Sequence, residues 1–138
     1  MNYGRIVLGG IVGGVVYNIV GIVVNMIALG ERYKILQGQK VFRVDPRLPF
    51  LPIYIVVVFL ISIGLVWLYA AVRPRLGPGP STALTVGLLV GLIHAVPAAI
   101  AQFSWSYAGG VVSLWQAIET VAGSALATLA GAWIYKEE

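Results

Sequence analysis

Four long apolar stretches divide the chain, and short polar segments separate them. They cover residues 5–29, 50–72, 82–104 and 111–135. Each is longer than the roughly 20 residues that a helix needs to cross the hydrocarbon core of a bilayer. The pattern predicts an all-α polytopic membrane protein with four transmembrane helices in an up-down bundle. We interpret residues 1–138 as a single domain, because every connection except the basic loop 30–49 is short.

Small residues recur at helical spacing inside the first, third and fourth stretches. In the first stretch, Gly10, Gly14 and Gly21 share one face with Asn18 and Asn25. Small residues let helix backbones approach closely in lipid, where helices associate by packing and by hydrogen bonds. We therefore expect these faces to pack helices together and to join the protein to other membrane subunits or to a second copy. The predicted packing residues are Gly10, Gly14, Gly21, Gly87, Gly91, Gly123 and Gly131.

Composition agrees with a membrane location. Of the 138 residues, 59% are hydrophobic and only 10% are charged, whereas soluble proteins have roughly 25% charged residues. The chain has no cysteine. This excludes disulfides, thiolate metal sites and cysteine nucleophiles.

Positive charge gathers beside the membrane. The net charge is +4, and the loop 30–49 holds Arg32, Lys34, Lys40, Arg43 and Arg47. Each such residue near an anionic surface contributes about 1 kcal/mol of attraction. Membrane lipids with anionic headgroups are therefore the predicted partner of this loop, rather than nucleic acid. The short turn "RPR" carries basic residues on the opposite side and, by the positive-inside rule, indicates cytoplasmic termini.

Polar side chains gather in one half of the predicted bundle. Counted along ideal helices with a rise of about 1.5 Å per residue, Glu119, His94 and Asn18 fall at one depth. An ionised carboxylate costs several kcal/mol in the bilayer interior. We therefore expect Glu119 to be protonated, paired with His94, or in contact with water or a partner. A second tier, nearer the surface of loop 30–49, contains Asn25, Tyr54, Gln102 and Gln116.

Three interpretations of this polar layer stay open. In the first, Glu119 and His94 form a hydrogen-bonded structural pair that holds helices or subunits together. In the second, the protein binds a ligand or pigment: His94 is the axial ligand of a haem or a chlorophyll-type magnesium, and Glu119, Asn18 and Gln116 supply hydrogen bonds. In the third, Glu119 is the proton-binding residue of a carrier. We expect neither a metal cage nor a catalytic motif, since the chain has one histidine and no recognisable nucleophile or phosphate-loop pattern.

Three segments carry a resemblance to known sequences: "MNYGRIVLGGIVGGVVYN", "VWLYAAVRPRLGPGPSTA" and "LATLAGAWIYKEE". Over most of its length the chain resembles an uncharacterised family of small four-helix integral membrane proteins of bacteria. The resemblance implies a four-helix fold and assigns no catalytic residue. We expect the protein to lie in the bacterial inner membrane. Taken with the glycine faces, the resemblance leads us to expect a non-enzymatic accessory or scaffold subunit.

Overall fold

The computed structural model describes residues 1–136, which form helices and connecting turns without a strand. In chain order the helices are α1 (Tyr3–Ile22), the π-helix η1 (Val23–Ala28), α2 (Gly30–Gly38), α3 (Phe50–Leu76), α4 (Pro80–Trp105) and α5 (Gly110–Ile134). Four spans are long and apolar enough to cross a membrane: α1 continued by η1, then α3, α4 and α5. The predicted all-α fold is confirmed, and its class is that of a multi-pass membrane protein.

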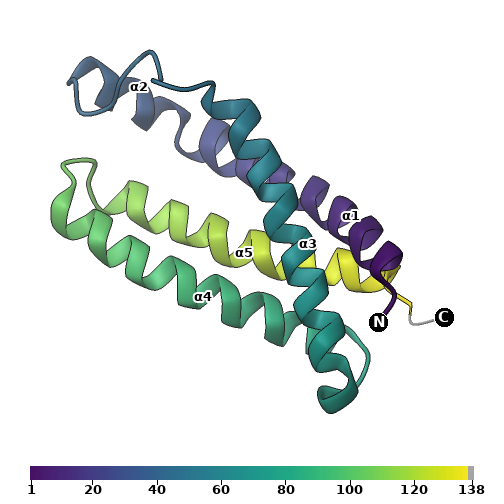
Figure 1. The fold of residues 1–138 in the computed structure, drawn as a ribbon. Helices are drawn as coiled ribbons and strands as arrows, with labels where there is room; N and C mark the ends of the chain where they lie inside the picture. Colours follow the sequence, from purple (N-terminus) through teal and green to yellow (C-terminus); the bar gives the residue numbers. More distant parts are fainter. Residues whose placement is uncertain (137–138) are drawn as a thin grey trace.

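The four long helices run up and down, and both termini lie at one end of the bundle (Figure 1). We call this the terminal end, and the end that carries α2 the loop end. At the terminal end α3 meets the beginning of α4, but towards the loop end it leans away from α4 and α5 (Figure 1). Most large side chains on the outside are apolar, as expected for helices whose outer faces contact lipid.

Glycines set the distance between α1 and its two neighbours. A Cβ atom added to Gly13 would lie 2.6 Å from the Ala127 carbonyl oxygen of α5, and one added to Gly10 would lie 2.5 Å from the Ile63 Cα of α3. Such distances are too short for any side chain larger than hydrogen. Helix α1 therefore packs backbone to backbone against both helices, as the small-residue pattern predicts.

The same device joins α4 to α5. A Cβ atom on Gly87 would lie 2.6 Å from the Ala125 Cα, and one on Gly91 would lie 2.9 Å from the Val121 Cα. The predicted packing residues meet other helices of the same chain. The nearest neighbour of an added Cβ atom, with the glycine that would carry the atom in parentheses, would be Ile63 (Gly10), Phe59 (Gly14), Glu119 (Gly21), Ala125 (Gly87), Val121 (Gly91), Tyr17 (Gly123) or Val66 (Gly131).

Two predicted boundaries are corrected. Helix α3 does not stop at residue 72 but passes through Pro74 to Leu76; the ring lies in the last turn, where the helix ends as Gly77 adopts a positive φ of 84°. The loop 30–49 is not irregular throughout, because α2 occupies its first part. Its Leu36 is only 1% exposed and belongs to a cluster against which Tyr33 also packs, so these side chains hold α2 against the bundle.

Candidate functional site: a cleft at the loop end

A large cleft lies at the loop end, where α3 separates from α4 and α5. Its volume is about 1130 Å³, slightly above the roughly 300–1,000 Å³ typical of small-molecule sites. Every helical segment contributes to the wall, together with the segment that joins α2 to α3. The wall is mostly apolar. Its apolar side chains include Ile22, Met26, Phe50, Leu51, Ile55, Ala95, Ala98 and Ala99.

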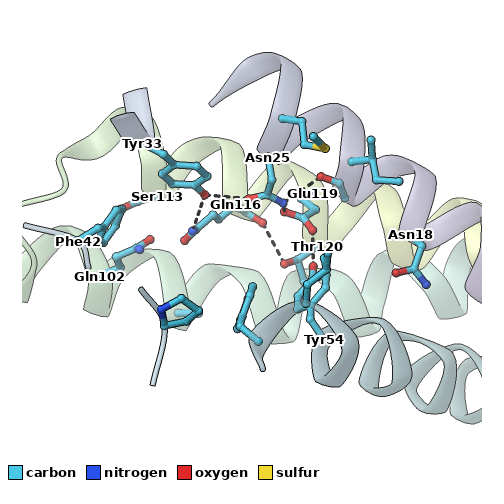
Figure 2. A pocket seen from close by; sticks show the side chains of 18 of the residues that line it. Asn18, Asn25, Tyr33, Phe42, Tyr54, Gln102, Ser113, Gln116, Glu119 and Thr120 are labelled. Carbon is cyan, nitrogen blue, oxygen red and sulfur yellow. Dashed lines mark hydrogen bonds between the residues drawn. The ribbon is translucent and has the colours of Figure 1, made fainter. Parts of the chain in front are cut away.

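Among the residues that the structure describes, Glu119 is the one wall residue with a carboxylate, and only 5% of its surface is exposed. The Asn25 side-chain amide donates a hydrogen bond to Glu119 Oε2 at 2.7 Å, and the Tyr54 hydroxyl donates to Oε1. These three side chains come from α5, η1 and α3 and converge in the cleft (Figure 2). The carboxylate is therefore held from two sides in a fixed orientation.

Two further side chains extend this network towards the loop end. The Gln116 amide donates to the Tyr33 hydroxyl at 3.2 Å, and that hydroxyl donates to Asn25 Oδ1 at 2.8 Å (Figure 2). Burial raises the pKa of the Tyr33 phenol above its ordinary value of 10.0, a shift that the bond from Gln116 opposes. Tyr33 thus stays protonated at neutral pH and remains a donor. The hydrogen bonds thus run in one direction, from Gln116 through Tyr33 and Asn25 to Glu119.

The backbone around Asn25 is adapted to this arrangement. Asn25 lies inside the π-helix η1, and its amide also donates to the Gly21 carbonyl oxygen at 3.0 Å. Short π-helical turns inside α-helices are rare and are frequent at functional sites. Gly21 also leaves room for the carboxylate, because a Cβ atom there would lie 3.0 Å from Glu119 Oε1. The π-helix η1 therefore directs a donor towards Glu119, and Gly21 in the last turn of α1 makes space for the carboxylate.

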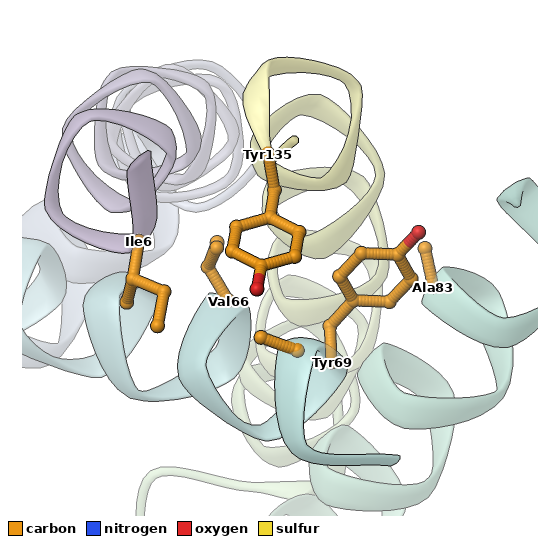
Figure 3. Packing of buried hydrophobic residues seen from close by; sticks show 6 residues of the cluster. Ile6, Val66, Tyr69, Ala83 and Tyr135 are labelled. Atoms are coloured by element: carbon orange, nitrogen blue, oxygen red, sulfur yellow. The ribbon is translucent and has the colours of Figure 1, made fainter. Parts of the chain in front are cut away.

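The bundle is closed beyond Glu119, towards the terminal end. Tyr17 is buried, its hydroxyl donates to the Thr120 carbonyl oxygen at 3.3 Å, and its ring packs where Gly123 has no side chain. Further along, Tyr69 and Tyr135 meet edge to face with ring centroids 6.1 Å apart (Figure 3). The cluster at this end comprises Ile6, Val66, Tyr69, Ala70, Ala83 and Tyr135. The cleft thus lies in the loop half of the bundle.

The structure brings most of the predicted polar residues to one cleft, although not in the predicted tiers. Asn18, Asn25, Tyr54, Gln102, Gln116 and Glu119 all line it. Glu119 bonds to Asn25 and Tyr54, which we assigned to the second tier, whereas the Asn18 amide bonds to its own helix at the Gly14 carbonyl oxygen, 2.8 Å away. Counting along straight α-helices misplaced them because it allowed neither for the π-helical turn that holds Asn25 nor for the lean of α3 (Figure 1).

His94 does not join this site. Its side chain is exposed on α4 and is not part of the cleft wall, whereas the next residue, Ala95, is buried and lines the cleft. Successive residues lie about 100° apart around a helix, so the two side chains diverge. The structure therefore does not form the predicted Glu119–His94 pair. The position of His94 also does not fit an axial ligand to a haem or chlorophyll held in this cleft.

Several residues of the wall were not predicted as site residues, among them Tyr33, Phe42, Arg43 and Phe50. Tyr33 and Phe42 pack together with ring centroids 5.7 Å apart, and Phe50 and Tyr54 do so at 5.5 Å. Of these, only Tyr54 was a predicted site residue; Arg43 also lines the cleft. Hydropathy and helical spacing do not reveal them, because Phe42 and Arg43 reach the cleft through the segment between α2 and α3.

No protein-family model, curated protein or solved structure matches this chain. The fold and the cleft define a class: a four-span helical membrane protein with a polar network at the wall of an apolar, one-sided cleft. The residues of the cleft are therefore the basis for its proposed function.

Proposed function

We propose that this protein is a non-enzymatic binding protein for an amphiphilic small molecule of the membrane. The observation that supports this most is the combination, in one cleft of about 1130 Å³, of a mainly apolar wall and, among the described residues, one hydrogen-bonded carboxylate, that of Glu119. Ligand sites of small molecules have this composition: apolar surface for affinity and a few fixed polar groups for orientation.

The divergence of α3 from α4 suggests the route of entry. Both helices are membrane spans, and the wall residues Ile55 of α3 and Ala98 of α4 belong to their loop-end halves. A ligand from the adjoining leaflet would pass between these helices with its apolar part in contact with lipid throughout. The basic segment with Arg43 would then lie at headgroup depth, where anionic lipids are its expected partners.

Two other hypotheses receive less support from the same contacts. An accessory subunit that associates through glycine faces needs those faces outside, but the predicted packing glycines meet helices of their own chain. A proton-coupled carrier needs access to Glu119 from both ends, and the buried Tyr17 and the backbone contact of Gly13 with Ala127 close the terminal end.

A matched pair of substitutions tests the proposed function. Ala98→Trp places a large ring in the cleft, whereas Ala101→Trp places the same ring on the same helix at an exposed position outside the cleft wall. The wild-type protein and both variants are purified in a mild maltoside detergent and compared by native mass spectrometry and by analysis of organic extracts. We expect a discrete bound amphiphile in the wild type and in Ala101→Trp, and its loss in Ala98→Trp. Equal retention by both variants would contradict the proposal.

A further inference from the structure

Glu119 forms no ion pair with any residue in the described part of the chain. The one ion pair there joins Lys34 to Glu31 on the exposed face of α2. Glu119 instead accepts hydrogen bonds from two neutral groups, Asn25 and Tyr54. Each carboxylate oxygen accepts up to two hydrogen bonds, so each can accept one more donor besides Asn25 or Tyr54. An ionised carboxylate among apolar side chains is costly unless a cation compensates it.

Aromatic rings line the same cleft on two sides. Phe50 and Tyr54 form one pair on α3, with ring planes inclined by 31°, and Tyr33 and Phe42 form the other, inclined by 60°. Figure 2 shows Tyr33 and Tyr54 approaching Asn25 and Glu119 from different sides. Aromatic faces attract cations, and cages of such rings bind quaternary ammonium groups. A cleft whose wall holds a carboxylate and two aromatic pairs is therefore suited to an alkylammonium group.

From these two observations we infer that the ligand of the cleft is an amphiphile with an ammonium headgroup, which Glu119 holds between the aromatic pairs. The inference rests on the proposed binding function and adds the charge of the ligand. The ammonium could belong to a zwitterionic phospholipid or to a free single-chain lipophilic amine. In the first case the phosphate of the lipid has a counterpart in Arg43, which lines the cleft in the segment before α3.

Three probes with the same tail test the charge preference. Dodecyltrimethylammonium, dodecanol and dodecyl sulfate are added below their micellar concentrations to the protein in maltoside micelles, and bound adducts are counted by native mass spectrometry. We expect the cationic probe to bind about tenfold more tightly than dodecanol, a ratio that corresponds to about 1.4 kcal/mol. Dodecyl sulfate should bind more weakly than dodecanol.

Variants assign this preference to the proposed groups. Glu119→Gln should abolish it, whereas Glu31→Gln, which removes a carboxylate 85% exposed on α2, should leave it unchanged. Phe50→Leu removes an aromatic face without touching the hydrogen bonds of Glu119, and should weaken the cationic probe about threefold relative to dodecanol. If Glu119→Gln does not fold, the proposal still depends on two results: the preference of the wild type for the cationic probe and the weakening of that preference in Phe50→Leu.

The outcomes separate the two levels of the proposal. Binding of all three probes without a charge preference, but with loss in Ala98→Trp, would overturn the inference and leave the binding function intact. Probe binding that is unaffected by Ala98→Trp would overturn both. The source of the ammonium follows from displacement: phosphatidylcholine that displaces the cationic probe indicates a lipid headgroup, and failure to displace it indicates a free amine. Equal displacement by phosphatidylglycerol would contradict a requirement for positive charge.

Discussion

Adding one methyl group at Gly13 tests the packing that fixes the site. A Cβ atom there would lie 2.6 Å from the Ala127 carbonyl oxygen and 3.2 Å from the carbonyl carbon. Both partners are backbone atoms of α5 and cannot rotate away, so α1 and α5 must separate by several tenths of an ångström. Overpacking of this kind costs about 1–3 kcal/mol. The displacement would also lengthen the bond between Asn25 and Glu119, which join the same two spans.

Gly64 provides the control, because the same substitution there meets no atom within 4 Å. Alanine is a better helix former than glycine by up to about 1 kcal/mol, so Gly64→Ala should be neutral or slightly stabilising. Unfolding of both variants is followed by circular dichroism as dodecyl sulfate is titrated into maltoside micelles. The reasoning would be refuted if Gly13→Ala and Gly64→Ala changed the free energy of unfolding by the same amount.

Three further predictions concern the site and the helix beside it. Glu119→Ala should destabilise the protein by about 1–3 kcal/mol because the Tyr54 hydroxyl loses its acceptor; the same titration should show a smaller loss for Glu119→Gln. Tyr33→Phe removes the hydroxyl that links two amide side chains, and should cost about 0.5–1.5 kcal/mol in that assay. Leu36→Ala should release α2 and accelerate proteolysis of residues 39–49, whereas Ile35→Ala, at a residue 51% exposed, should not.

Each of these predictions has a contrary outcome. An unchanged stability in Glu119→Ala would mean that the carboxylate is held by water and not by the Tyr54 hydroxyl. A Tyr33→Phe protein as stable as the wild type would show that α2 is fixed by its apolar side chains alone. Equal proteolysis of the two α2 variants would indicate that burial of Leu36 does not anchor this helix.

The closeness of polar residues in one half of the bundle could be predicted because depth in a membrane follows from position along a helix. In the sequence, Glu119, Asn25, Tyr54 and Gln116 each lie within a few turns of the loop end of their predicted helix. All four line the cleft. Their hydrogen bonds could not be predicted in the same way. A bond of 2.7 Å between Asn25 and Glu119 depends on a π-helical turn and on the spacing of α1 and α5, and both arise from contacts between helices.

The sequence by itself determined the number of spans, the glycines that pack helices together and the half of the bundle that holds polar residues, since hydropathy and helical spacing are local properties. Only the tertiary structure decided the lean of α3, the helix within loop 30–49 and the outward direction of His94. The physical reason lies in the solvent. Lipid is as apolar as the protein interior, so a helix such as α4 has apolar side chains all round. Its pattern therefore does not show which face turns towards the cleft.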